Sequence, residues 1–340
     1  MLASETASSR VVMVALAGNL AIALIKLAAF ATTRSTAMLT EAIHSFVDTG
    51  DQILLMVGQA RGRRAPDASH PFGYGMETYF WSFIVALMIF MVGGALSIWE
   101  GFEKLLHPAE VGSPWINLVV LAISAVFEGV SFRLAYRGYR RMVRGRNVRL
   151  WQFLVISKDP SLFSTLLEDG AALTGLSLAA LGVIGEAWLG MPWADGAASI
   201  AIGLLLVAVA VFMANETRSL IAGESAAPFI VAEAREALEA DPRVAKLVDL
   251  SSLQLGPQQI LLAVTLRFRR GMTGEEMEQA SDDLVARAQA SDPRICSVFL
   301  RPCTAGFADE IARSGTASQP PAVSPPGKGG SEPGSGPHAT

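Results

Sequence analysis

Long apolar stretches fill the first two thirds of this 340-residue chain. A helix that crosses a bilayer needs about 20 mainly apolar residues. Six stretches reach that length: 11–32, 37–60, 79–101, 114–137, 162–186 and 194–215. The second stretch is the least apolar, because five polar residues interrupt it: Glu41, His44, Asp48, Asp51 and Gln52. The pattern predicts an all-α membrane domain of six helices over residues 1–220.

The basic residues support the count of six. Lys and Arg concentrate in cytoplasmic connections of membrane proteins. With six spans, the basic positions before span one, at 61–64, at 137–158 and at Arg218 fall on one side, and only Arg34 and Lys104 lie on the other. Omitting the second span would scatter them. We therefore expect a multi-pass protein with both termini in the cytoplasm. We interpret the first stretch as a retained span and not as a signal peptide. The lack of an Arg- and Ser-rich transit segment favours a bacterial inner membrane.

The pattern changes after residue 220. An amphipathic helix is expected first, two strands joined by Gly256-Pro257 follow, Thr273 opens a second helix with Glu276 in a capping-box position, and a short strand ends the series. The expected ranges are 228–240, 244–255, 258–268 and 295–300, with the second helix between the last two. This order predicts a small α+β cytoplasmic domain over 225–304. The Pro-, Gly- and Ser-rich residues 305–340 are expected to be disordered.

Composition excludes several classes of protein. Hydrophobic residues make up 51% and charged residues 17% of the chain, with a mean hydropathy of +0.40. These values do not suit a chain that is mostly disordered, and two cysteines cannot make a disulfide scaffold. The net charge of −4 gives no support for a nucleic-acid partner. Cys296 and Cys303 are expected to be reduced thiols. No motif of covalent catalysis is present, so an enzyme is not expected.

Acidic residues inside a span are costly and face protein or water, which makes them functional candidates. In the second span, His44 and Asp48 lie one turn apart on a polar stripe. Imidazole with carboxylate suits zinc or a similar divalent metal. The fifth span has a second polar stripe, which consists of Ser161, Ser164, Thr165, Glu168 and Asp169.

Each such residue also has a structural interpretation. A lone intramembrane histidine can simply be hydrogen-bonded to a neighbouring helix, and an acid near a span end can be hydrated. Two polar stripes on two spans favour a metal site over both. Glu128 in the fourth span could serve a proton path or only hydrogen bonding, and Asn19 in the first span is interpreted as structural.

Two segments make the chain resemble the cation diffusion facilitator family of proton-coupled divalent-metal exporters. They are Thr40–Gln52 (TEAIHSFVDTGDQ) and His70–Gly75 (HPFGYG), in the context of six spans and a small C-terminal domain. The resemblance covers nearly all of residues 10–304. It implies a homodimer and a ferredoxin-like cytoplasmic domain.

The resemblance also implies a ligand set of His44 and Asp48 from span two and Asp169 from span five. Thr165 stands where common zinc exporters of the family have His or Asp, so the fourth ligand is open. Glu168, a water molecule, or a preference for a different ion could each account for the departure. The adjacent Glu168-Asp169 resembles a branch that includes a mitochondrial zinc transporter.

Other family sites are expected to be absent. In the loop with Asp67 and His70, Tyr74 stands where many relatives have a second His, and Tyr binds zinc poorly. The cytoplasmic domain has no His, since the four in the chain are His44, His70, His107 and His338.

The sequence therefore predicts a metal–proton antiporter that exports a divalent cation, with zinc as the leading cargo and no resident cofactor. Metal ligands must be deprotonated, so protons and metal compete for one site. Iron, manganese or cobalt could replace zinc as cargo. A sodium–proton exchanger is disfavoured by His44, because sodium prefers oxygen ligands. A membrane metal sensor that transports nothing is the remaining alternative.

Overall fold

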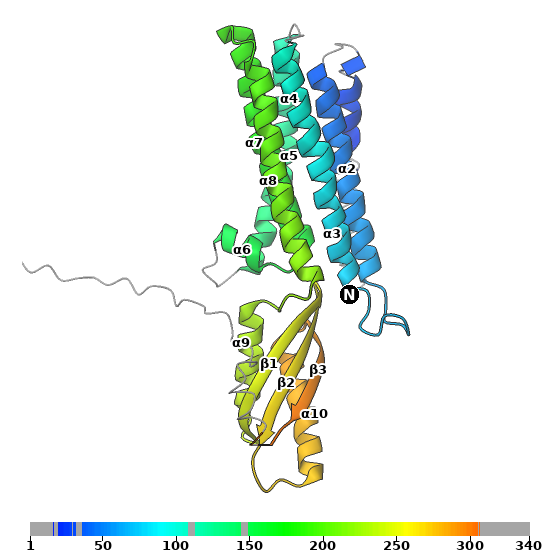
Figure 1. The fold of residues 1–340 in the computed structure, drawn as a ribbon, viewed down its shortest axis with the longest axis vertical. Helices are drawn as coiled ribbons and strands as arrows, with labels where there is room; N and C mark the ends of the chain where they lie inside the picture. Colours follow the sequence, from blue (N-terminus) through cyan, green and yellow to red (C-terminus); the bar gives the residue numbers. More distant parts are fainter. Residues whose placement is uncertain are drawn as a thin grey trace, which may run out of the picture. The chain divides into compact units, whose positions relative to one another are not determined.

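The computed structural model of the 340-residue chain describes residues 16, 20–28, 30, 31, 36–107, 113–143, 149–304 and 306. For residues 36–41, 43, 44 and 142 it describes the backbone alone. The chain divides into two compact units. The first contains residues 1–227 with 252–261 and 294–297, and the second contains the remainder. The first is mainly a bundle of long helices, and the second contains helices and strands (Figure 1).

The helical unit is built mainly from long helices (Figure 1). Its elements are α2 (Thr36–Gly62), α3 (Met76–Met88), the π-helix η1 (Ile89–Ala95), α4 (Leu96–Leu106), α5 (Pro114–Met142), α6 (Leu150–Ile156), α7 (Pro160–Leu189) and α8 (Ala194–Ile221). Because α3, η1 and α4 follow one another without a break, they form one rod of 31 residues.

Four of the described helices are long and apolar enough to cross a membrane. They are Met76–Leu106, Pro114–Arg141, Pro160–Leu189 and Ala194–Ile221. They correspond to the third to sixth expected spans, and each extends beyond the expected range at one end or both. α2 has 27 residues and covers the expected second span, but its polar stripe keeps it out of this apolar set. Much of the expected first span lies outside the described residues.

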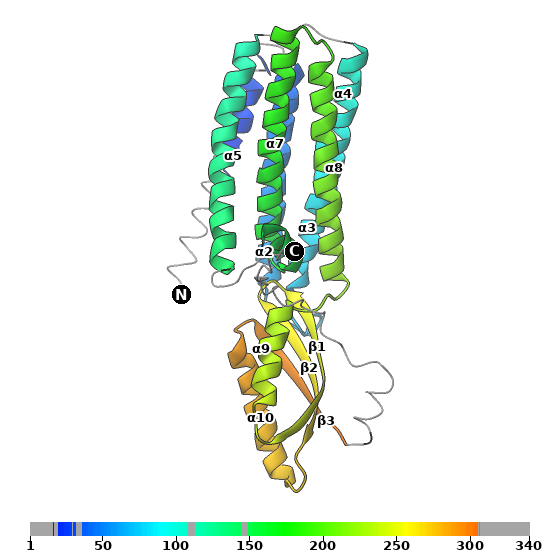
Figure 2. The same ribbon diagram turned by 90° about the vertical axis from the view of Figure 1, so that its left-hand side faces the viewer.

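Contacts at the helix ends show that α2 and α5 both run in the direction opposite to α7. At one end, the Gln59 side chain donates to the Ser161 hydroxyl at 2.8 Å, which brings the end of α2 to the start of α7. At the other end, Trp115 at the start of α5 packs on Trp188 near the end of α7, with ring centroids 5.4 Å apart. The two ends of the bundle are visible in Figure 2.

The start and end of α7 are fixed by local chemistry. The Asp159 carboxylate accepts a hydrogen bond from the Ser161 backbone N–H at 3.1 Å, and Pro160 occupies the first helical turn, where no N–H is needed. The helix stops at Gly190, whose φ of +64° is a left-handed conformation that glycine adopts without a Cβ clash. These caps define the register in which α7 carries its acidic residues.

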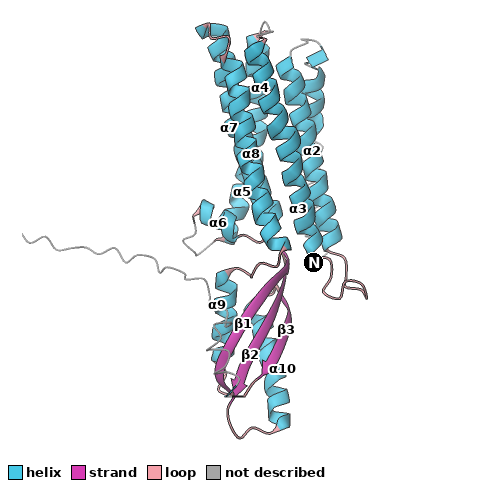
Figure 3. Cartoon of the chain, in the orientation of Figure 1, coloured by secondary structure: helices cyan, strands magenta, loops and turns pink. Residues whose placement is uncertain are grey.

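The second unit contains most of the small α/β domain (Figure 3). Its elements are α9 (Pro228–Glu239), β1 (Val244–Gly256), β2 (Gln259–Phe268), α10 (Gly274–Ser291) and β3 (Ile295–Pro302), with sheet order β1-β2-β3. The expected element order is confirmed. The Ile260 N–H bonds to the Arg294 carbonyl, and Cys303 N–H to the Leu266 carbonyl, so β3 runs parallel to β2.

Details of this domain also follow the sequence pattern. Ile230, Ala234 and Leu238 form the buried face of α9, and every second residue of β2 from Ile260 to Phe268 is buried. The expected capping box is present, since Thr273 N–H donates to the Glu276 carboxylate at 2.7 Å. Cys296 is exposed, and both cysteines are free thiols.

An ion cluster ties α10 to the start of β1. Asp241 is buried and accepts two hydrogen bonds from the Arg243 guanidinium, at 3.0 and 2.8 Å. Arg243 also donates to Asp283 of α10 at 2.8 Å. Hydrogen bonding from Arg243 lowers the pKa of Asp241 to about 2.

Candidate intramembrane metal site

The polar stripe of α2 faces inward. Ser45, Thr49 and Asp51 are buried, whereas Phe46 and Ile53 on other faces are exposed. The Thr49 hydroxyl donates to the Ser45 carbonyl at 2.8 Å, so it bonds back to its own helix. A membrane helix with polar residues inside and apolar residues outside suits a rod that lines a hydrated or ion-binding interior.

The acidic pair of α7 is directed into the same interior. Asp169 is buried, and its carboxyl group is hydrogen-bonded to the Ser131 side chain of α5. The Ser164 hydroxyl donates to the Glu168 carboxylate at 2.7 Å. Thr165 behaves differently, since its hydroxyl donates to the Ser161 carbonyl of its own helix at 2.8 Å.

A cavity of about 30 Å³ brings the two helices together. It is lined by Asp48 and Gln52 of α2, Glu168 and Asp169 of α7, and Glu128 of α5. Residues of η1 and α8 complete its wall. Thr165 is not among its lining residues. The space is sufficient for an ion or one to two water molecules.

Acidic side chains are concentrated at and beside this cavity. The Oδ1 atom of Asp51 and the Oδ2 atom of Asp169 are buried without a hydrogen-bond partner. Asp48 and Glu128 both act electrostatically on Glu168 and Asp169. Acids concentrated in this way repel one another and favour a cation among them.

The described side chains do not by themselves form a complete metal shell. No group of three or more His, Cys, Asp or Glu among them is close enough to hold a metal ion. His44, one of the predicted ligands, lies on α2 one turn before Asp48, and its side chain lies outside the described residues. Of the four predicted ligands, the structure therefore places Asp48, Glu168 and Asp169 at one cavity.

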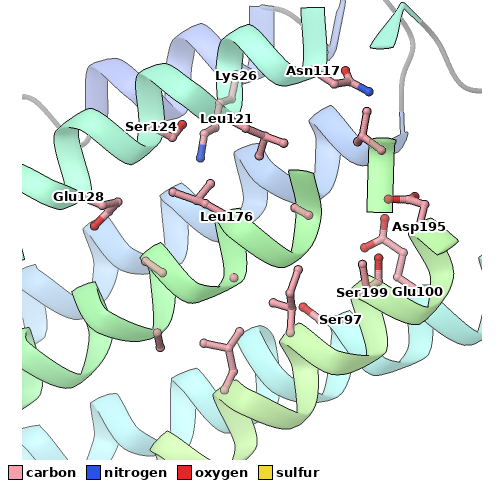
Figure 4. A pocket seen from close by; sticks show the side chains of 18 of the residues that line it. Lys26, Ser97, Glu100, Asn117, Leu121, Ser124, Glu128, Leu176, Asp195 and Ser199 are labelled. Atoms are coloured by element: carbon pink, nitrogen blue, oxygen red, sulfur yellow. The ribbon is translucent and has the colours of Figure 1, made fainter. Parts of the chain in front are cut away.

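A second cavity, of about 80 Å³, shares Asp48 and Glu128 with the first. Figure 4 shows its polar lining, which includes Asn117 and Ser124 of α5 and, farther along, Glu100, Asp195 and Ser199. At this far end, Lys104 of α4 pairs with Asp195 of α8 at 2.9 Å. Polar groups thus continue from the acidic cavity to one end of the helical unit.

Lys26 is a lining residue that was not among the candidates from the sequence. It belongs to the expected first span, is buried with 4% of its surface exposed, and lines the larger cavity. The available signal was a single basic residue inside an otherwise apolar run. Glu128 was recognised only as a weaker candidate, but it lines both cavities.

The loop between α2 and α3 uses its acid for structure. The Asp67 carboxylate accepts hydrogen bonds from the Tyr74 hydroxyl at 2.7 Å and from Ser69 and the His70 N–H. Bonds from Tyr74, Ser69 and His70 hold the pKa of Asp67 below its usual range. Tyr74 therefore engages the one carboxylate that an auxiliary metal site in this loop would need.

A bundle of membrane-type helices with acids converging in its interior, joined to a small α/β domain, is typical of an ion carrier of the membrane. Residues 12–222 match the family described as the cation efflux transmembrane domain. The chain therefore belongs to the cation efflux family, which confirms the resemblance drawn from the sequence.

Relatives of known name point the same way. The "Proton-coupled zinc antiporter SLC30A9, mitochondrial" of Xenopus laevis is 34% identical over 277 residues, 81% of this chain and 50% of that protein. Its Homo sapiens namesake is 36% identical over 259 residues, 76% of this chain and 46% of that protein. "Metal tolerance protein C4" of Arabidopsis thaliana is 30% identical over 265 residues, 78% of this chain and 58% of that protein. The chain thus spans about half the length of these relatives.

Proposed function

We propose that this protein is a secondary transporter that exchanges a divalent metal cation, zinc in the first place, for protons. The observation that carries the proposal is the convergence of Asp48 from α2 with Glu168 and Asp169 from α7 at one intramembrane cavity. His44 completes the proposed ligand set, since it precedes Asp48 by one helical turn. The proposal includes six spans with both termini in the cytoplasm of a bacterial cell, a ferredoxin-like C-terminal domain and a homodimer.

Competition between protons and metal gives the exchange. A metal ion binds ionised carboxylates and a neutral imidazole, so protons that add to these groups displace it. An imidazole changes its protonation between about pH 5 and 8, which lets small pH differences load or unload the site. Facing the cytoplasm, the site gives up protons and takes the dication. Facing the more acidic side, it is protonated and releases the ion, while the helices rock around the cavity.

Two arguments favour zinc as cargo. A mixed imidazole and carboxylate site suits zinc and other first-row dications, whereas sodium and magnesium prefer oxygen ligands alone. The relatives from Xenopus laevis and Homo sapiens are named as zinc antiporters. Iron, manganese and cobalt share enough of this chemistry to be measured beside zinc.

The test is transport by the full-length protein in sealed proteoliposomes that contain zinc- and pH-sensitive dyes. We expect zinc entry to be accompanied by proton exit, and we expect Asp48→Asn and His44→Ala to abolish both. Glu186→Gln is the matched control, because Glu186 lies on α7 but lines neither cavity. It should retain zinc flux close to that of the unchanged protein.

Three results would contradict the proposal. Undiminished flux in Asp48→Asn or His44→Ala would exclude this site. Sodium-driven proton movement without metal transport would indicate the exchanger alternative. Zinc binding with no movement of metal across a sealed vesicle would indicate a sensor.

A further inference from the structure

Lys26 is a cationic residue in the interior of a membrane-type bundle. Its amino group donates a hydrogen bond to the Ser45 hydroxyl of α2 at 2.8 Å, and both residues are buried. A charged side chain in a span is expensive and is retained where it pairs with other polar groups or serves an ion path. Ser45 directly follows His44 in the sequence, so the contact places the Lys26 amino group beside the polar stripe of α2.

The surroundings of Lys26 are acidic. It lines the larger cavity together with Asp48 and Glu128, and both of these residues also line the smaller cavity with Glu168 and Asp169. Figure 4 shows Lys26 extending into the cavity, which Ser124 and Glu128 of α5 also line. One built-in positive charge therefore faces the same acids that a metal cation would approach.

We propose that Lys26 is a resident counter-cation that sets the affinity of the cavity for its metal cargo. This proposal rests on the proposed transport function and adds Lys26 as a residue that determines the affinity for metal. When the site holds no metal, the ammonium group offsets part of the carboxylate charge. When a dication enters, the ammonium group repels it, because like charges at close range interact strongly in a medium of low dielectric constant.

The consequence is a carrier that binds its cargo less tightly than its acids alone would allow. A carrier must release its ion on the far side, so a site that binds too tightly traps the cargo and slows turnover. Lys26 acts on the ion through space and is not a metal ligand in this proposal. The hydrogen bond to Ser45 keeps the amino group on the α2 side of the cavity.

The test compares zinc binding by the unchanged full-length protein, Lys26→Met and Lys26→Arg in detergent at one pH and ionic strength. Methionine has a similar length without the charge, and arginine keeps the charge. We expect Lys26→Met to bind zinc about tenfold to a hundredfold more tightly, and to turn over more slowly in proteoliposomes. Lys26→Arg should stay within about threefold of the unchanged protein. A loss of structure would not tighten binding, so a gain in affinity is specific to the charge.

Lys26→Gln is a second neutral variant in case Lys26→Met does not fold, as judged by its elution from a sizing column. If the folded neutral variant binds zinc as weakly as the unchanged protein, or more weakly, the proposal for Lys26 is overturned. The transport function is a separate matter, and it stands as long as the unchanged protein transports zinc. If the unchanged protein neither binds nor moves zinc, the transport function itself fails and Lys26 has no role of this kind.

Discussion

The side chains of Glu168 and Thr165 show how one helical turn separates two candidates for the same role. Glu168 lines the acidic cavity and accepts a hydrogen bond from Ser164, so one of its oxygens is held in place. The Thr165 hydroxyl is engaged by the Ser161 carbonyl. Among the three possibilities left by the sequence, the geometry favours Glu168 as the residue that supplements Asp169.

We therefore predict different results for the two substitutions. Glu168→Gln should weaken zinc binding by about tenfold or more, because an ionised ligand is replaced by a neutral amide. Thr165→Val should stay within about twofold, since its hydroxyl serves its own helix. Titration calorimetry on the two purified variants measures both effects. A large loss in Thr165→Val with none in Glu168→Gln would instead assign the position to Thr165.

At this scale, the sequence indicated the acids but not the cation beside them. Asp48, Glu168 and Asp169 were predictable from the sequence, because helical spacing places polar residues of one span on one stripe. Lys26 was not, because one lysine hardly changes the mean hydropathy of a long apolar stretch and nothing local shows which way it points. A lone Glu128 was ambiguous for the same reason, and only packing brought it to both cavities.

The rod of α3, η1 and α4 owes its close fit with α8 to small residues. A Cβ atom added to Gly101 would lie 2.8 Å from the Gly196 carbonyl oxygen, and one added to Gly203 would lie 2.8 Å from the Gly94 carbonyl oxygen. The two backbones therefore touch, which is a common way for membrane helices to associate without a hydrophobic drive. This contact positions η1 and α8 as walls of the acidic cavity.

We predict that Gly101→Ala lowers the thermal unfolding midpoint of the detergent-solubilised protein, because the added methyl group meets backbone that cannot move aside. Overpacking of this kind costs about 1–3 kcal/mol. Gly129→Ala is the control, since a Cβ at Gly129 of α5 meets nothing within 4 Å. It should leave the midpoint unchanged or raise it. Equal effects of both substitutions would show that the close contact is unimportant.

The ranges of the elements were largely predictable, but the π-helical segment was not. In a strongly apolar span, every face of the helix is apolar, whether it contacts lipid or protein. The sequence therefore has no hydrophobic period that could reveal a local change from α-helix to π-helix. In the small domain, alternation in β2 and the capping box before α10 carried clear local signals, and these elements appear where expected.

On the scale of the whole chain, charge is distributed unevenly between the two ends of the helical unit. A methyl group on Gly138 near the end of α5 would lie 3.3 Å from Leu162 at the start of α7, so the arginines that end α5 share an end of the unit with the start of α7. The arginine at the end of α2 lies at this same end, since Gln59 bonds to Ser161. The sequence predicted this uneven distribution of basic residues, because the charges in the connections can be located without knowledge of the fold. It could not reveal the cavities, which exist only when distant helices pack.

The excess of arginine at this end predicts that it faces the cytoplasm, since positive connections are retained on that side. Native Cys296 in the α/β domain is exposed, so its labelling tests whether the C-terminal domain lies in the cytoplasm. With Cys303 replaced by serine, a membrane-impermeant maleimide should label Cys296 in inverted vesicles and not in right-side-out ones. Ser113→Cys in a background without native cysteines is the matched reporter for the opposite end, because Ser113 is exposed at the start of α5. It should label in right-side-out vesicles. Labelling of Cys296 from outside would reverse the orientation, and with it the direction in which the proposed carrier takes up its cargo.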